Sequence, residues 1–293
     1  MKVVKYGRKT CENSILCLGY FDAIHKGHRS IIEIAKSTAK SENLKVALML
    51  FTGGKNGEKD LFTLDERLFL LEREGVDIVI VQQLDATFMS KSKVEFLDDI
   101  FAFTNAKAIV TGKDFKFGKK AQGDVEFLKE YCKIKKVKVL TAQDVLDENG
   151  AKISTQSIKN LIKNGEVEIA NKYLDGKYFI LGKIVKGKGL GEKIGFPTAN
   201  VLASDNKAVI KWGVYLTSTE IGGKEYKCIT NVGSQPTFDG ESEVIESYID
   251  GFSGNLYGKT LKFYFEKRIR DIVKFQSIKE LILQLEKDKE YLK

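Results

Sequence analysis

Two histidines, His25 and His28, are the only ones in the 293-residue chain, and they lie three positions apart. Imidazoles at this spacing can donate hydrogen bonds to phosphoryl oxygens as negative charge builds on them. Gly19 and Gly27 allow the backbone to approach a ligand, and a helix beginning near Gly27 offers free N–H groups to phosphate. The pattern favours a phosphate-transfer site over the alternative, two ordinary loop histidines without chemistry.

The segments around this pair predict the elements that position it. An apolar strand is expected at residues 14–19 and a helix at 27–40, so the histidines fall in a strand–loop–helix connection. Thr63 and Glu66 form a capping box that opens a second helix, which ends at Gly75. Further strands are predicted at 44–51, 76–81, 106–111 and 137–140, and further helices at 92–103 and 124–132. Apolar strands alternating with helices predict a parallel sheet covered on both faces, with ligands at the carboxyl ends of the strands.

The sequence pattern changes after about residue 175. Short β-branched or aromatic segments separated by glycines predict strands at 178–186, 213–220, 224–231, 244–250 and 260–266. They are typical of a small antiparallel barrel. Ile278, Leu281, Ile282 and Leu285 then indicate a terminal amphipathic helix. We expect an α/β plus β protein with domains at residues 1–174 and 175–293.

The composition excludes several classes of protein. Hydrophobic residues make up 43% and charged residues 30% of the chain, and no run approaches the ~20 apolar residues of a membrane span. With no apolar signal segment at the N-terminus, we expect a cytoplasmic protein without a membrane partner. Four scattered cysteines, without a CxxC pair, favour neither disulfides nor zinc.

The basic excess is the remaining clue from composition. The net charge is +8, but the lysines are dispersed apart from small clusters such as Lys133, Lys135, Lys136 and Lys138. A nucleic-acid-binding protein needs a concentrated basic face, which this pattern does not predict. We therefore expect no nucleic-acid partner and interpret the excess as a solvated surface.

Four segments resemble one family in the expected order. Residues 19–28, GYFDAIHKGH, resemble the HxGH signature of nucleotidylyltransferases in the form typical of bacterial bifunctional riboflavin kinase/FMN adenylyltransferases, or FAD synthetases. Residues 111–118 with Gly123-Asp124 resemble the GxDFxFG…GD stretch, and residues 153–159 the second phosphate-binding motif. GFPTAN at 195–200 matches the riboflavin kinase signature. The resemblance implies a Rossmann-like HxGH nucleotidylyltransferase domain followed by a kinase barrel.

For the first domain, the resemblance implies adenylyl transfer from ATP to FMN. His25 and His28 would hold the ATP phosphates, and Gly19, Phe21 and Gly27 would shape the same loop. Ser154, Thr155 and Lys159 would contact the departing pyrophosphate. Asp114, Phe115 and Phe117 would lie in the flavin or nucleotide pocket. The chain departs from the family at Lys159, usually arginine, and at residues 52–56, which lack the usual Pro-His-Pro element.

For the second domain, the resemblance implies riboflavin phosphorylation. The Thr198 hydroxyl and the Asn200 amide oxygen are hard ligands suited to Mg²⁺ that bridges ATP phosphates. The glycines Gly187, Gly189 and Gly191 would cover those phosphates, although Leu190 replaces the usual arginine. Glu246 matches the family's catalytic glutamate and is the candidate base.

The expected ligands are riboflavin, FMN, FAD and ATP, with Mg²⁺ as the cofactor, and weak self-association stays open. One alternative keeps only the kinase and treats the first domain as degenerate, because residues 52–56 and Lys159 depart from the family pattern. Another is a nucleotidylyltransferase that acts on a different phosphate. GFPTAN disfavours it, because such an enzyme needs no second magnesium–nucleotide site.

Overall fold

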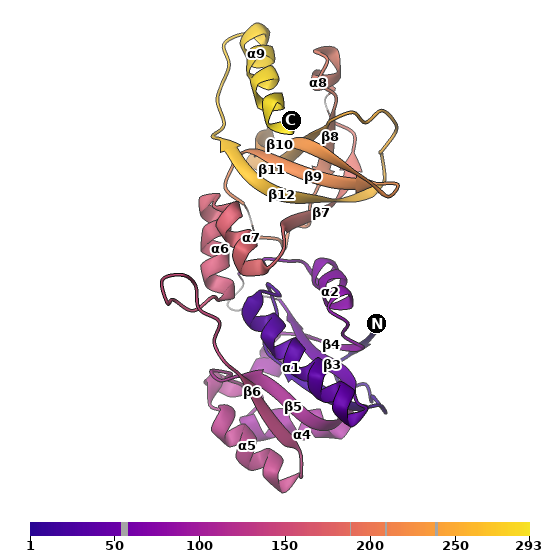
Figure 1. Cartoon of the computed structure of the whole chain (residues 1–293), viewed down its shortest axis with the longest axis vertical. Helices are drawn as coiled ribbons and strands as arrows, with labels where there is room; N and C mark the ends of the chain where they lie inside the picture. Colours follow the sequence, from indigo (N-terminus) through magenta and orange to yellow (C-terminus); the bar gives the residue numbers. More distant parts are fainter. Residues whose placement is uncertain (54–57, 188, 209, 238–239) are drawn as a thin grey trace. The chain divides into compact units, whose positions relative to one another are not determined.

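The computed structural model describes residues 1–53, 58–187, 189–208, 210–237 and 240–293. The chain forms two compact units, Met1–Thr155 and Gln156–Lys293, and each has its own sheet (Figure 1). Among the described residues, no helix is both long and apolar enough to cross a membrane.

The first unit is built on a six-stranded sheet with the order β1-β4-β3-β2-β5-β6, in which every neighbouring pair is parallel. Its strands are β1 (Lys2–Lys5), β2 (Asn13–Leu18), β3 (Lys45–Thr52), β4 (Ile78–Gln83), β5 (Asn105–Gly112) and β6 (Lys138–Ala142). The predicted parallel sheet is confirmed. The short, charged β1 was not predicted, and it adds one edge strand beside β4.

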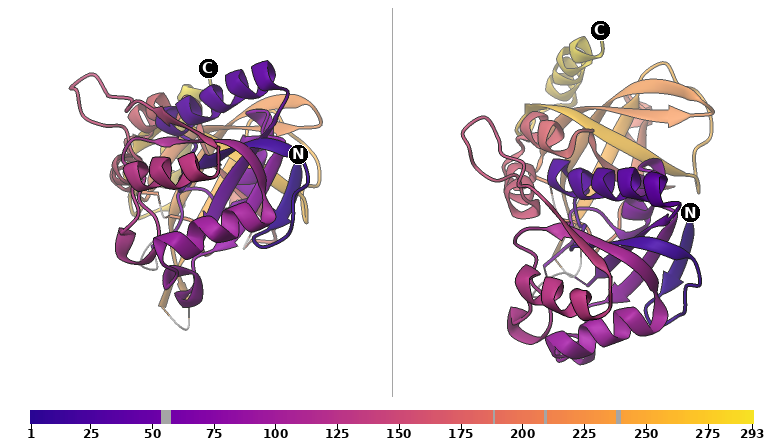
Figure 2. Two further views of the ribbon diagram at one scale, coloured as in Figure 1. Left: turned by 90° about the horizontal axis from the view of Figure 1, so that it is seen from below. Right: turned by 60° about the horizontal axis from the view of Figure 1, so that its bottom comes forward.

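Helices cover both faces of this sheet, as expected (Figure 2). Alternating strand residues supply the two cores: Cys17 packs with Ile32 on one face, whereas Leu16 packs with Phe96 on the other. The helices are α1 (Lys26–Glu42), α2 (Leu64–Arg73), α3 (Ala86–Met89), α4 (Lys93–Phe103) and α5 (Val125–Ile134), with a 3-10 turn η2 (Lys119–Ala121). The capping box that opens α2 is present, because Thr63 and Glu66 exchange hydrogen bonds of 2.8 and 3.3 Å.

The second unit contains a closed barrel with the order β10-β11-β8-β7-β12-β9. Its strands are β7 (Tyr178–Val185), β8 (Thr198–Leu202), β9 (Gly213–Ile221), β10 (Lys224–Thr237), β11 (Gly240–Ile249) and β12 (Thr260–Arg270). The helical elements are α6 (Thr155–Asn164), α7 (Val167–Leu174), α8 (Leu190–Lys193), α9 (Ile278–Lys289) and the 3-10 turn η3 (Glu290–Leu292). The predicted barrel and terminal helix are confirmed, and the unpredicted sixth strand is β8.

The helix α7 belongs with the barrel by its contacts. The Asn171 amide donates to the Phe265 carbonyl at 2.8 Å, and the Tyr178 N–H donates to the Asn171 amide oxygen at 2.7 Å. The compact units divide between Thr155 and Gln156, at the start of α6, whereas the sequence assigns residues 156–174 to the first domain. The functional domain limits 1–174 and 175–293 stay a prediction.

Candidate active sites

His25 caps α1 with its own side chain. Its Nδ1 accepts the N–H groups of Gly27 at 3.0 Å and His28 at 3.3 Å. An accepting ring nitrogen carries no hydrogen, so neutral His25 carries its proton on Nε2. Folding thus fixes the tautomer and leaves Nε2–H as the donor for a ligand.

The two imidazoles stack on each other. Their centroids lie 3.9 Å apart and their planes differ by 20°. Burial, and then the positive charge of Lys152, lowers the pKa of His25 to about 4. Burial also holds the pKa of His28 well below its ordinary value, followed by the charges of His25 and Lys152. Both rings are therefore neutral at pH 7 and act through N–H groups rather than through charge.

Buried aromatic rings explain the two glycines of this loop. A Cβ on Gly27 would lie 2.9 Å from Cε1 of His25, and a Cβ on Gly19 would lie 2.9 Å from the Phe21 ring. Phe21 itself has a φ of 48° and packs against His28 with centroids 4.9 Å apart. A positive φ at such a bulky residue is strained by about 1–2 kcal/mol. Phe21 therefore supports His28 from within the core, and the glycines make room for the rings.

An anchor that the sequence did not reveal holds the segment before α2. The Asp22 carboxylate accepts the Leu61 N–H at 2.8 Å. The buried guanidinium of Arg67 donates to Asp60 at 2.9 Å and to the Phe51 carbonyl at 2.6 Å. These bonds tie the carboxyl end of β3 to the histidine loop. The family-divergent loop begins at Thr52 and Gly53, whereas residues 54–56 lie outside the described residues.

Asp114 follows the carboxyl end of β5, as the predicted sheet requires, and it is exposed. It forms an ion pair with Lys152, which also pairs with Asp144 at 2.8 Å. The positive charge of Lys152 acts on both histidines and lowers the pKa of each. Lys152 was not among the residues predicted for this site, although it directly precedes the second phosphate-binding motif.

Phe115 and Phe117 form a stacked pair with centroids 5.5 Å apart. Phe117 packs in the core, where its ring lies 5.2 Å from that of Phe96, while Phe115 is half-buried. Phe115 is therefore the more accessible of the two predicted pocket residues, and Phe117 packs against it from the core side.

The second phosphate-binding motif spans the division between the units. The carbonyl oxygen of Ile153 lies 3.9 Å from the position of a Cβ on Gly27, so the motif begins beside the histidine loop. Ser154 and Thr155 are half-buried at the start of α6. Lys159 is buried and belongs to the second unit.

In the second unit, predicted site residues meet across neighbouring strands. Glu246 of β11 lies directly opposite Asn200 of β8. Both are half-buried, whereas Ile245 and Ser247 on either side of Glu246 are buried. Because side chains alternate along a strand, Glu246 and Asn200 share the outer face of the barrel.

The glycine-rich loop lies against the same strand. A Cβ on Gly187 would overlap the Asn200 amide, and a Cβ on Gly191 would overlap the Phe196 carbonyl with the Thr198 hydroxyl 3.4 Å away. Gly189 has a φ of 69°, which favours glycine. The structure thus brings Gly187 and Gly191 onto Asn200 and Thr198, next to Glu246.

Comparisons with known proteins match both domains of the chain. The FAD synthetase family model matches residues 7–157, and the riboflavin kinase family model matches residues 174–293. A bifunctional riboflavin kinase/FMN adenylyltransferase of Bacillus subtilis is 35% identical, with 94% of this chain and 90% of the relative covered. The chain belongs to this family. A relative of the same name from Haemophilus influenzae is 31% identical, with 97% and 95% covered.

A solved structure supports the same fold over the whole length. A chain described as a macrolide-efflux protein from Streptococcus pneumoniae superposes with a TM-score of 0.91 at 32% identity, covering 100% of this chain and 99% of that one. Both domains of the bifunctional family are present, which favours two activities over the kinase-only alternative. The chain is a transferase with a nucleotidyltransferase domain and a kinase domain.

The residues present at the kinase site fit a magnesium ion. No side-chain hydrogen bond of Thr198 or Asn200 is found within the described part of the chain, so their oxygens are available as ligands. Within that part, no group of three or more His, Cys, Asp or Glu side chains could hold a metal. Mg²⁺ usually takes few protein ligands and completes its shell with phosphate oxygens and water.

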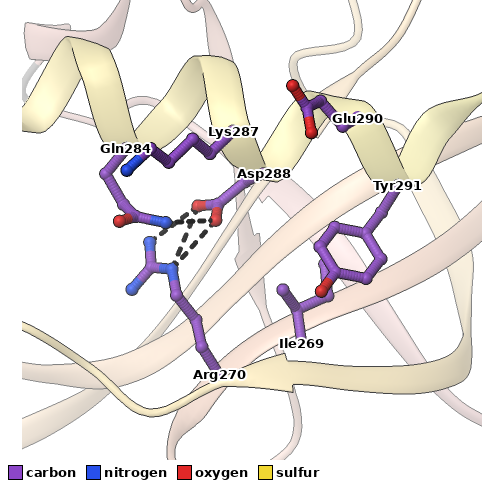
Figure 3. Close-up of a pocket in the computed structure, with 7 residues that line it drawn as sticks. All are labelled: Ile269, Arg270, Gln284, Lys287, Asp288, Glu290 and Tyr291. Carbon is purple, nitrogen blue, oxygen red and sulfur yellow. Dashed lines mark hydrogen bonds and ion pairs between the residues drawn. The ribbon is translucent and has the colours of Figure 1, made fainter.

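A separate pocket of about 490 Å³ lies between α9 and β12 (Figure 3). At its base Arg270 forms two-point contacts with the buried Asp288, including one of 2.7 Å, and Gln284 donates to Asp288 at 2.9 Å. No residue predicted for either site lines it. These polar contacts attach the terminal helix to the barrel.

Proposed function

We propose that the chain phosphorylates riboflavin to FMN with Mg-ATP and adenylylates FMN to FAD with release of pyrophosphate. The register of Glu246 against Asn200 beside the glycine-rich loop carries the kinase assignment. The neutral, stacked histidines at the start of α1 support the adenylyltransferase assignment.

In adenylyl transfer, an FMN phosphate oxygen attacks the α-phosphorus of ATP, and the bond from that phosphorus to the pyrophosphate oxygen breaks. His25 donates Nε2–H to the phosphate oxygens, and His28 donates beside it, stabilising the charge that builds there. Lys152 adds positive charge to the same site. No covalent enzyme intermediate is needed, so the rate acceleration comes from holding ATP and FMN in the geometry for attack.

The remaining residues of the first site hold the two substrates. Gly19, Phe21 and Gly27 keep the histidine loop in shape. Ser154, Thr155 and Lys159 contact the leaving pyrophosphate. The flavin or nucleotide side is formed by Asp114 and Phe115, with Phe117 behind them.

In the kinase reaction, the riboflavin 5′-hydroxyl attacks the γ-phosphorus of ATP while Glu246 accepts its proton, and ADP leaves. Thr198 and Asn200 would hold Mg²⁺, which would neutralise charge on the ATP phosphates. Gly187, Gly189 and Gly191 cover those phosphates with backbone N–H groups.

The proposed setting is the cytoplasm, with riboflavin, FMN, FAD and ATP as ligands. All four cysteines are free, three of them buried, which suits a reducing compartment. Weak self-association stays a prediction.

The test incubates the protein with riboflavin and Mg-ATP and separates the products by chromatography. We expect both FMN and FAD. His28→Ala should abolish FAD and spare FMN, because it removes a phosphate donor from the first site only. Glu246→Gln should slow FMN formation about 10²–10⁴-fold and leave FAD formation from added FMN intact.

The exposed Glu225 of β10 supplies the matched control, since Glu225→Gln should change neither product. FMN without FAD from the wild-type protein would favour the kinase-only alternative. FAD from the His28→Ala protein at the wild-type rate would remove the assignment of the first site.

A further inference from the structure

A third polar side chain continues the row formed by Asn200 and Glu246. Asn231 of β10 lies directly opposite Glu246, on the side away from Asn200. Its neighbours Thr230 and Val232 are buried, whereas Asn231 is half-buried. Asn200, Glu246 and Asn231 therefore stand side by side on the outer face of the barrel, one per strand, at separations of about 5 Å.

The two ends of this row have different neighbours. At one end Gly187 lies against the Asn200 amide, where the glycine-rich loop begins. At the other end a Cβ on Gly233 would lie 2.8 Å from Cδ1 of Ile272 and 3.9 Å from the amide nitrogen of Asn231. The glycine-rich loop thus lies at the Asn200 end of the row, and the exposed apolar side chain of Ile272 lies at the Asn231 end. The carboxylate of Glu246 lies between the two amides.

This order matches the acceptor of the proposed kinase reaction. The reacting hydroxyl must lie between Glu246 and the ATP phosphates on the Asn200 side. The rest of the acceptor must then extend away from Asn200, over Asn231. A polyol comes next to the reacting hydroxyl in riboflavin, and an apolar ring follows it.

The amide of Asn231 is available for such a contact. It has no hydrogen-bonding partner among the residues that the structure describes. An amide offers both a donor and an acceptor, which suits a hydroxyl that can itself do both. A site that hydrogen-bonds a substrate hydroxyl discriminates against analogues that lack it.

We propose that Asn231 is a specificity residue of the kinase site and binds the 3′- or 4′-hydroxyl of the acceptor's polyol chain, the two secondary hydroxyls nearest the reacting 5′ end. This inference rests on the proposed kinase function, and it assigns the acceptor to the β10 side of Glu246. The donor nucleotide lies on the β8 side.

The test compares riboflavin with 3′-deoxyriboflavin and 4′-deoxyriboflavin in the full-length protein. We expect the wild-type protein to use one deoxy analogue at least about tenfold less efficiently, by kcat/KM, than riboflavin. Asn231→Ala should raise the KM for riboflavin about tenfold and leave the KM for ATP within about twofold of wild type. In this variant the ratio of kcat/KM for riboflavin to kcat/KM for the deoxy analogue should be close to one. Asn231→Ser, which keeps a short hydroxyl, should retain part of the discrimination.

The exposed Asn206 is the matched control, and Asn206→Ala should leave all ratios unchanged. A denaturant titration followed by the fluorescence of Trp212, which belongs to the same unit, reports that the barrel of each variant is folded. The inference is overturned if the wild-type protein accepts both analogues as well as riboflavin, or if Asn231→Ala keeps the wild-type ratios. Absence of FMN from the wild-type reaction would instead overturn the proposed kinase function on which it rests.

Discussion

The imidazoles of His25 and His28 stack at 3.9 Å while Nδ1 of His25 caps the helix that carries His28. His25 therefore orients His28 in two ways, by accepting its backbone N–H and by stacking on its ring. The cap works only while Nδ1 is unprotonated. The geometry and the protonation state of this site are thus coupled.

This coupling predicts a pH dependence of stability. The pKa of His25 falls from 6.5 to about 4 on folding, so between these values the unfolded chain binds more protons than the folded one. The free energy of unfolding should therefore fall as the pH falls; His25 alone contributes about 2 kcal/mol between pH 7 and pH 5, and His28, whose pKa is also lowered, adds to the fall. Calorimetry of the wild-type protein at several pH values measures this loss.

His25→Asn separates the cap from the titration, because asparagine also caps helices but does not ionise in this range. The variant should lose part of the pH dependence of the first unit between pH 7 and pH 5. An unchanged slope in the variant would show that His25 does not titrate as expected.

A methyl group at Gly27 should impair the first site by displacing the His25 ring. Alanine normally stabilises a helix by about 1 kcal/mol relative to glycine, but here its Cβ would press on the His25 ring. We expect Gly27→Ala to slow FAD formation from FMN at least about tenfold and to leave riboflavin phosphorylation unchanged. Gly176→Ala is the control, because a Cβ there meets nothing within 4 Å.

Gly187→Ala should act on the other reaction. Its Cβ would displace the Asn200 amide and thereby weaken the hold on magnesium-bound phosphate. The kcat/KM for Mg-ATP in riboflavin phosphorylation should fall about tenfold, with a higher Mg²⁺ requirement, because one ligand contact is lost. Titration of Mg²⁺ at fixed ATP measures this, and a variant with the wild-type Mg²⁺ curve would contradict it.

Asp288→Asn should destabilise the second unit. The substitution leaves the Arg270 guanidinium without its carboxylate at a largely buried position, which costs about 3 kcal/mol. Trp212 is the only tryptophan and belongs to this unit, so its fluorescence in a denaturant titration follows the unfolding. The exposed Asp205 serves for comparison, and Asp205→Asn should shift the midpoint little.

Local patterns were enough to predict most of the first unit. The strand before His25 and the helix after it carry the expected periodicities, and the capping box of Thr63 and Glu66 is local by nature. Strand β1 escaped prediction because four residues, two of them lysine, have no periodicity to read. Only its pairing with β4 makes it a strand.

The missed site contacts join residues that are distant in the sequence. Asp22 meets Leu61, and Lys152 meets Asp114, so neither pair has a local signal. The row of Asn200, Glu246 and Asn231 likewise depends on strand register. Strand β8 was hidden because its residues were interpreted as a ligand-binding motif, whereas the structure shows that they also form a strand. The roles of the site residues remain predictions.

The two sheets also differ in how their edges are protected. The barrel closes on itself, whereas the sheet of the first unit ends in β1 and β6. Open strand edges invite pairing between molecules, and lysines discourage it. Lys2 and Lys5 bound β1, and the cluster of Lys133, Lys135, Lys136 and Lys138 leads into β6. We expect these lysines to oppose such pairing, so neutralising them should lower solubility before it lowers activity.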